Sequence, residues 1–117
     1  MKIGAAGLAE VDLVIPQGTT LSFEVTHTDE DGQTIDHSAS TAALAIAGND
    51  GVCIESWDSY VTCSATLITV SVPATATAAL PLGKMLWDLM VTMSNGQVLR
   101  LAYGACNVVD TYALDGE

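Results

Sequence analysis

Residues 87–104 read WDLMVTMSNGQVLRLAYG, two apolar runs on either side of an Asn-Gly pair. Asn95-Gly96 between alternating apolar residues predicts a β-hairpin with a type I′ turn, because both turn residues tolerate positive φ angles. The return strand is expected over residues 97–109. The first strand places five large apolar side chains on one face of the hairpin: Met85, Trp87, Leu89, Val91 and Met93. Each fully buried side chain of this size stabilises a fold by roughly 1.5–3 kcal/mol, so the hairpin is expected to form much of the core.

Short alternating segments also precede the hairpin. Strands are predicted in residues 11–16, 21–26, 41–47 and 65–72, and a second hairpin in residues 52–63 with its tip at residues 57–59. Pro73 and the alanine-rich run after it predict a short helical crossover over residues 73–80. Turn signals every 8 to 12 residues with little helix are typical of a sandwich. The predicted fold is all-β, an immunoglobulin-like antiparallel β-sandwich of about seven strands with one short helical crossover.

The predicted sandwich occupies residues 11–112 and is flanked by two short segments. Residues 1–10 are rich in Gly and Ala and show no periodicity, so they are expected to form a flexible N-terminal arm that a partner orders. Residues 113–117 are expected to form a C-terminal tail.

The composition indicates one soluble domain that has a partner. Of the 117 residues 50% are hydrophobic and only 15% are charged, which leaves few charged side chains to cover a small monomer. The formal net charge of -11 would repel phosphate backbones, so nucleic-acid binding is not expected. No apolar stretch approaches the roughly 18 residues of a membrane span, and a secretory signal is not expected at the N-terminus.

Three cysteines, Cys53, Cys63 and Cys106, show no CxxC spacing. An odd number without paired spacing indicates neither a disulfide framework nor a zinc site. The predicted hairpin over residues 52–63 brings Cys53 roughly opposite Cys63, yet both are expected to remain thiols in a reducing compartment.

The sequence offers few groups for catalysis. His27 and His37 are the histidines that could act as bases at neutral pH, and no GxSxG, HExxH or glycine-rich phosphate loop accompanies them. We therefore expect a protein that is not an enzyme and binds no cofactor.

An acidic turn follows the second predicted strand. Its carboxylates could in principle gather oxygen ligands for calcium: Asp29, Glu30, Asp31 and Asp36. Their spacing does not match an EF-hand loop, so we favour a solvated hairpin loop held by Gly32 and predict no metal site.

Three residues are candidate partner contacts. Trp57 is predicted at a loop tip, where an aromatic ring can anchor a protein or stack on a sugar. Ile3 and Leu8 supply apolar side chains to the predicted arm. Trp87, in contrast, alternates with core positions and is predicted to be buried.

Five segments occur in an order that resembles a known family: VIPQGTT, THTDEDGQTID, TAALPLG, WDLMV and SNGQVLRLAYGACNV. The chain resembles, over roughly residues 11–110, the immunoglobulin-like module at the N-terminus of phage baseplate upper proteins and of small prophage minor structural proteins. The matching residues are Gly18, Asp29, Asp31, Gly32, Ile35, Asp36, Thr77, Ala78, Leu80, Gly83, Trp87, Asp88, Leu89, Gly96, Val98 and Gly104.

This resemblance implies a non-enzymatic virion protein of the tail, baseplate or head-tail region. Such a protein would bind other phage structural proteins and would form a homo-oligomer or occur in several copies in the virion. It would be found in the host cytoplasm during assembly. Two alternatives stay open: a capsid decoration protein, and a carbohydrate-binding module that recognises the host surface.

Overall fold

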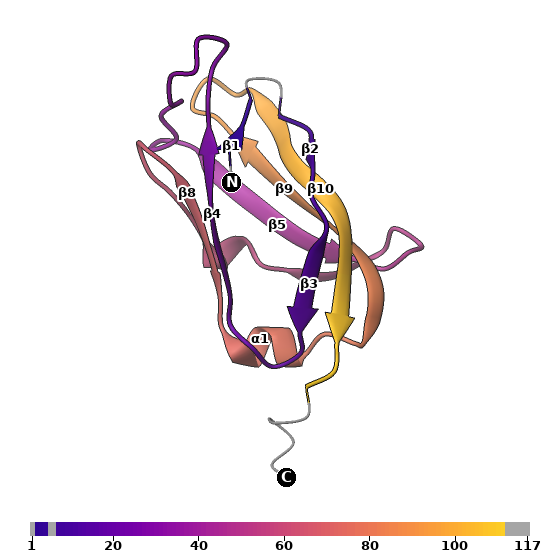
Figure 1. Cartoon of the computed structure of the whole chain (residues 1–117). Coiled ribbons are helices and arrows are strands. Elements are labelled where there is room, and N and C mark those ends of the chain that lie inside the picture. Colours follow the sequence, from indigo (N-terminus) through magenta and orange to yellow (C-terminus); the bar gives the residue numbers. More distant parts are fainter. Residues whose placement is uncertain (1, 5–6, 112–117) are drawn as a thin grey trace.

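The computed structural model describes residues 2–4 and 7–111, and these form a β-sandwich with one short α-helix (Figure 1). The predicted fold class is confirmed. The smaller sheet contains β1 (Lys2–Ile3), β4 (Leu21–His27), β7 (Val61–Cys63) and β8 (Ile68–Val72). The larger sheet contains β2 (Ala9–Glu10), β3 (Leu13–Pro16), β5 (Thr41–Ala47), β6 (Cys53–Ser56), β9 (Gly83–Thr92) and β10 (Val98–Val109).

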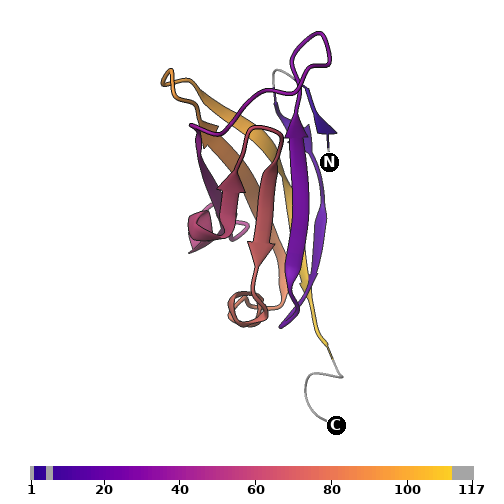
Figure 2. The same ribbon diagram turned by 90° about the vertical axis from the view of Figure 1, so that its left-hand side faces the viewer.

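The two sheets enclose one hydrophobic core. Their strand orders are β1-β4-β8-β7 and β2-β10-β9-β5-β6, and β3 also pairs with β10. In Figure 2 the strands β4 and β8 lie in front of the long β9–β10 hairpin. On both sheets, alternating side chains point into the space between the sheets. The buried residues of this core include Val25, Leu44, Ile46, Ile68, Val70, Val72, Leu89, Val91 and Leu101.

The first strands make both sheets mixed rather than purely antiparallel. β1 pairs in parallel with β4, whereas β2 and β3 pair in parallel with β10. The chain therefore crosses from one sheet to the other within its first ten residues. The other strand pairs are antiparallel, as predicted.

The described residues of the predicted arm, 2–4 and 7–10, lie on the sandwich itself. Ile3 pairs with His27, and its side chain is only 2% exposed within the core. Ala9 and Glu10 pair with β10. This corrects the expectation that these residues need a partner to order them, because the edges of β4 and β10 supply the backbone hydrogen bonds. The predicted tail, residues 113–117, lies outside the described residues.

The β9–β10 hairpin forms where the sequence predicts it. Met85, Trp87, Leu89 and Val91 are buried on its inner face. The predicted type I′ turn is wrong, because Gly96 has a φ of 88° but Asn95 has no positive φ. The amide of Gly96 donates to the carbonyl of Met93, and the loop comprises three residues with glycine in the left-handed conformation.

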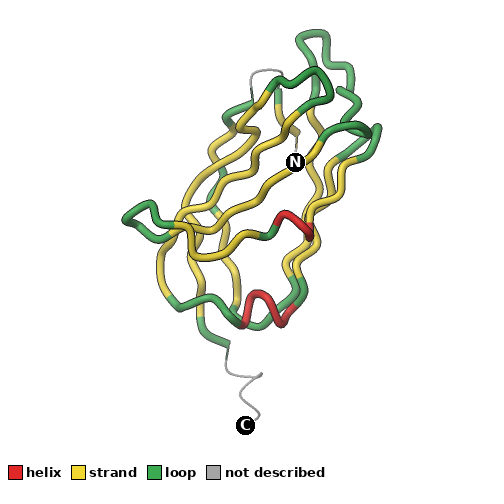
Figure 3. The backbone as a smooth tube through the Cα atoms, turned by 180° about the vertical axis from the view of Figure 1, so that it is seen from behind, coloured by secondary structure: helices red, strands yellow, loops and turns green. Residues whose placement is uncertain are grey.

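Residues 52–63 do not form the predicted hairpin. β6 pairs with β5 in the larger sheet, and β7 pairs with β8 in the smaller one. Between them lies η1 (Asp58–Tyr60), a 3-10 turn that carries the chain across the sandwich (Figure 3). Cys53 and Cys63 are consequently on different sheets and do not face each other, and all three cysteines are unpaired.

The predicted helix is present as α1 (Ala74–Ala78), which begins directly after Pro73 and closes one end of the sandwich (Figure 1). Thr77 is completely buried, and its hydroxyl donates to the carbonyl oxygen of Thr19 at 2.6 Å. Gln17 donates to the carbonyl oxygen of Leu80 at 2.7 Å. These hydrogen bonds join the crossover to the turn before β4.

The burial of the cysteines predicts how they react with an alkylating reagent. Cys53 is exposed, whereas Cys106 is completely buried, and burial raises the pKa of the Cys106 thiol to about 11. Because only the thiolate is a good nucleophile, native protein is expected to be labelled first at Cys53 and at Cys106 only after unfolding. Peptide mass spectrometry after timed alkylation checks this order. Equal labelling of both residues in native protein would contradict the burial of Cys106.

Candidate functional site

Of the three predicted partner contacts, only Leu8 is exposed. Trp57 and Ile3 are both 2% exposed and belong to the core, so the prediction that they are surface contacts is wrong. Leu8 is 58% exposed and has a φ of 62°, just before β2. Trp87 is buried, as predicted.

Trp57 is buried because its neighbours bind the chain to β5. The amide of Trp57 donates to the carbonyl oxygen of Leu44 at 2.7 Å, and the carboxylate of Asp58 accepts from the amide of Leu44 at 2.9 Å. These two bonds turn the chain inward after β6, and the indole fills the space between the sheets. A tryptophan in a polar segment therefore fills the core at a crossover rather than lying at a hairpin tip.

The outer face of the larger sheet has two adjoining hollows. The first, of about 300 Å³, is lined on β5 by Ala45 and Ala47, whose short side chains leave the backbone close to the surface. The second, of about 380 Å³, extends toward β2 and β10. Three residues line both hollows: Leu86, Trp87 and Arg100. We call this surface the outer face; its exposed residues include Glu10, Lys84, Leu86 and Arg100, and its half-buried ones Asp88 and Tyr103.

Arg100 holds a fixed position at the centre of the outer face. Its Nε atom lies 3.3 Å from the carboxylate of Asp88, and its guanidinium carbon lies 4.4 Å from the centre of the Tyr103 ring. A partly exposed ion pair contributes little to stability, but here a cation-π contact orients the same guanidinium. The arrangement gives the face a preformed polar and aromatic centre.

A β-bulge brings Tyr103 beside Arg100. Arg100 pairs with Met90, and Ala102 pairs with the next residue of β9, Leu89, so Leu101 is the extra residue. Simple alternation would point residues 100 and 103 to opposite sides of the sheet. The extra residue reverses this and turns both side chains outward.

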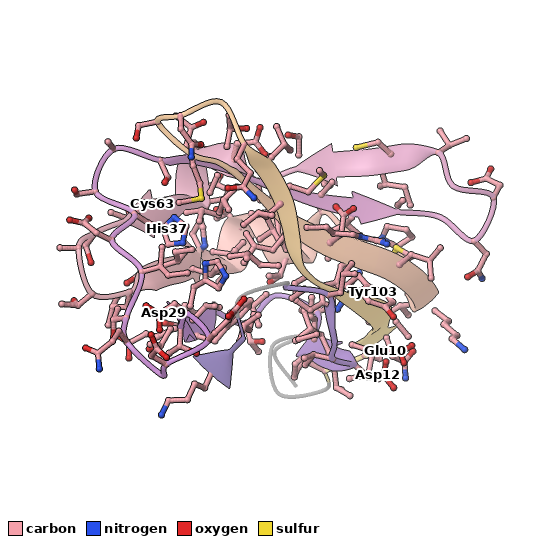
Figure 4. All side chains as sticks on the ribbon, turned by 90° about the horizontal axis from the view of Figure 1, so that it is seen from above. Glu10, Asp12, Asp29, His37, Cys63 and Tyr103 are labelled. Carbon is pink, nitrogen blue, oxygen red and sulfur yellow. The ribbon has the colours of Figure 1, made fainter. Side chains whose placement is uncertain are left out.

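The rim of the second hollow depends on a close approach between β10 and residues 11–12. Trp87 donates its indole N–H to the carbonyl oxygen of Val11 at 2.8 Å, and the amide of Ala105 donates to Asp12 at 3.2 Å. A Cβ atom at Gly104 would overlap that same carbonyl oxygen. Glycine at position 104 therefore allows β2 and β3 to follow β10. Figure 4 shows Glu10, Asp12 and Tyr103 together on this side of the molecule.

His37 lies on the opposite side of the molecule from these residues (Figure 4), and it forms a buried pair with His27. His27 and His37 are each 1% exposed, and His27 Nδ1 lies 2.9 Å from His37 Nε2. The other ring nitrogen of His37, Nδ1, lies 2.9 Å from the hydroxyl oxygen of Ser40. The two rings are nearly parallel, at 18°, with centres 5.1 Å apart, and they are thus part of a hydrogen-bonded network inside the protein.

The acidic turn forms a hairpin loop, as favoured from the sequence. Thr28 pairs with Thr34 across it, and the carboxylate of Asp29 accepts hydrogen bonds from the amides of Asp31 and Gln33. Gly32 has a φ of 83°, which suits the turn. Among residues 2–4 and 7–111 no three His, Cys, Asp or Glu side chains are grouped to hold a metal ion.

Comparison with known proteins yields distant structural similarities. No family model and no curated protein matches the sequence. The structure is similar to CopC from Methylosinus trichosporium OB3b, with a TM-score of 0.45 and 11% identity over 92% of this chain and 88% of that one. It is also similar to a family 123 glycoside hydrolase from Clostridium perfringens, with a TM-score of 0.46 and 9% identity over 88% of this chain and 23% of that one.

The described part of the chain contains no helix with the length and apolar character that crossing a membrane requires.

Proposed function

We propose that this protein is a non-enzymatic structural protein of a bacteriophage virion, a small immunoglobulin-like attachment module of the tail, baseplate or head-tail region. The order of the five sequence segments supports the phage assignment. The outer face supports the attachment role, and it is the observation on which this role depends. It combines an exposed Leu86, a tyrosine and an ion pair beside two open hollows.

The partner of the outer face is a different virion protein that presents basic side chains. Two copies of a chain with a net charge of -11 repel each other, which disfavours a second copy at this face. Asp88 pairs with Arg100, and among the other charged residues of the second hollow the two carboxylates of Glu10 and Asp12 outnumber the single ammonium group of Lys84, so this rim attracts cations. Apolar contact at Leu86 and Tyr103 then supplies the affinity.

The position of the histidines supports a role without catalysis. Both side chains are buried, and one hydrogen bond joins His27 Nδ1 to His37 Nε2. A general base must reach the proton that it removes from a substrate. A buried base occupied by internal hydrogen bonds has no such access.

The two alternatives differ in where the protein is found and what it binds. A capsid decoration protein would use the same face on a lattice of capsid subunits. A carbohydrate-binding module would need an exposed aromatic ring on which a sugar can stack, and Trp57 was the candidate. Trp57 is buried, so it cannot serve as this ring. We therefore prefer attachment to a protein.

Purified particles test the proposal. Virions from the phage or lysogen that carries the gene are separated on a density gradient, and the protein is quantified by targeted mass spectrometry against the major capsid protein. Co-migration at a few copies per particle supports the tail or baseplate assignment, whereas copies in proportion to capsid subunits indicate decoration. Absence from infectious particles would overturn the proposed function.

Leu86→Glu is expected to lower incorporation into particles by about tenfold or more, because a buried charge in an interface is costly. Leu86 is 41% exposed, so the thermal stability of the isolated protein should change little. The matched control is Ser71→Glu, which adds the same charge to an exposed position of β8 on the other sheet. Equal incorporation of the two variants would exclude the outer face as the attachment surface.

A further inference from the structure

The His27–His37 pair lies where three segments of the chain meet. The amide of Thr28 donates to Ile3 on β1, and the amide of Ile35 donates to the carbonyl oxygen of His27, both at 2.8 Å. The amide of His37 donates to the carbonyl oxygen of Ser64 at 3.1 Å, in the loop between β7 and β8. The pair thus connects β1, the acidic segment of residues 28–40 and the β7–β8 loop.

The network is complete when its protons are arranged as in neutral imidazoles. One ring donates an N–H to the other across the 2.9 Å between His27 Nδ1 and His37 Nε2. Within the described residues, no buried side-chain nitrogen or oxygen lacks a hydrogen-bond partner. One extra proton still leaves a donor and an acceptor at this contact. A second extra proton leaves two N–H groups directed at each other, both positively charged and shielded from water.

We propose that the His27–His37 pair is a pH-operated latch, which holds β1 and the 28–40 segment on the sandwich at neutral pH and releases them when both imidazoles are protonated. The geometry makes this release local. The hydrogen bonds of the β9–β10 hairpin involve neither histidine, and most of the core lies between the other strands. This proposal is independent of the proposed virion function.

The charges around the pair favour release in mildly acidic solution. Burial and the charge of His27 lower the pKa of His37 below its usual 6.5, and the carboxylate of Asp36 opposes this shift. A base with a lowered pKa in the folded state makes stability fall as the pH decreases below 6.5. The charged or titratable groups on the surrounding segments are Lys2 on β1, Glu24 on β4, the four acids Asp29, Glu30, Asp31 and Asp36 of the 28–40 segment, and Cys63 at the end of β7. Figure 4 shows Asp29, His37 and Cys63 on one side.

The pH range separates this latch from ordinary acid denaturation. The hydrogen bonds from Ser38 lower the pKa of Asp36 from its usual 3.8. The stability that Asp36 contributes is therefore present above pH 3.8 and is lost only below that value. A loss of local structure between pH 6.5 and pH 4 is expected from the histidines and not from this carboxylate.

Amide exchange measured by NMR on the full chain tests the latch. Between pH 7.5 and pH 5 the protection factors of the amides of Thr28, Ile35 and His37 are expected to fall by about tenfold or more. Those of amides in the β9–β10 hairpin should stay constant. Uniform protection across the chain, or a loss confined to pH values below 4, would overturn the proposal.

Two variants and a titration make the test specific. His37→Gln removes the titrating ring but keeps a polar side-chain amide at the same place. In this variant the protection factors of the backbone amides of Thr28 and Ile35 should no longer depend on pH. Asp36→Asn removes the negative charge that favours protonation of His37, so release should move to lower pH. If His37→Gln does not fold, the imidazole nitrogen shifts of His37 in the wild-type protein decide, because the latch requires the pKa of this ring to lie below its usual 6.5. A His37 ring that titrates at or above pH 6.5 contradicts the latch.

Discussion

Gly104→Ala is expected to destabilise the protein by about 3 kcal/mol or more. The new methyl group would overlap the carbonyl oxygen of Val11 and lie 2.8 Å from its carbonyl carbon. Backbone atoms cannot rotate away as a flexible side chain can, so residues 11–12 must leave β10. That movement also breaks the hydrogen bond from the Trp87 indole to Val11. Urea unfolding monitored by tryptophan fluorescence measures the change.

Gly4→Ala is the matched control for this substitution. A Cβ atom at Gly4 meets no other atom within 4 Å, and its φ lies outside the range in which glycine is favoured. We expect the free energy of unfolding to change by less than about 0.5 kcal/mol, the usual range for surface substitutions. Equal stability of the Gly104→Ala and Gly4→Ala variants would show that the backbone between β2 and β3 does not contact β10 at Gly104 as described.

Trp57→Ala is expected to cost about 3–5 kcal/mol of folding stability, the range typical of removing a large buried aromatic residue. The indole lies between the two sheets and is 2% exposed. Its removal leaves a cavity that the surrounding strands cannot fill, because β5 and η1 are fixed by the hydrogen bonds of Leu44. Thermal unfolding followed by circular dichroism provides the measurement.

Ser59→Ala, two residues further along and exposed, controls for effects on η1 itself. It should leave the unfolding midpoint nearly unchanged. A Trp57→Ala variant as stable as this control would mean that the indole is a surface group, and the carbohydrate-binding alternative would regain its candidate residue.

Several elements of the fold are predictable from local sequence, because apolar and polar residues alternate along the strands. Apolar residues at every second position identify β4, β8 and β9, because strands with one buried face must follow a period of two. Pro73 and the alanines after it identify α1 for a similarly local reason. These features depend on neighbouring residues alone.

The pairing of β1 and β2 depends on distant parts of the chain. β1 and β2 have two residues each, which is too short for any periodicity to appear. The residues between β6 and β7 are also ambiguous, since a hairpin and a crossover require similar turn residues. The hydrogen bond from the amide of Leu44 to the carboxylate of Asp58 favours the crossover over the hairpin, and it joins residues 14 positions apart in the sequence.

The outer face is only partly predictable. Alternation around Trp87 places Asp88 on the outside, as observed. The outward position of Tyr103 depends on the bulge at Leu101, and no residue type at this place in the sequence predicts a bulge. The partnership of His27 with His37 was likewise hidden, because each histidine in isolation is an ordinary polar residue beside an acidic turn.

The parallel pairing of β3 with β10 has a consequence for how the protein folds during synthesis. Leu13 pairs with Cys106 and Pro16 with Val109, so β3 pairs with a strand that is synthesised much later. The loop closed by this contact contains β4 to β9, and its entropy must be lost before the contact stabilises anything. The larger sheet therefore cannot be completed until β10 has left the ribosome, and until then the edges of β3 and β9 stay open to other chains.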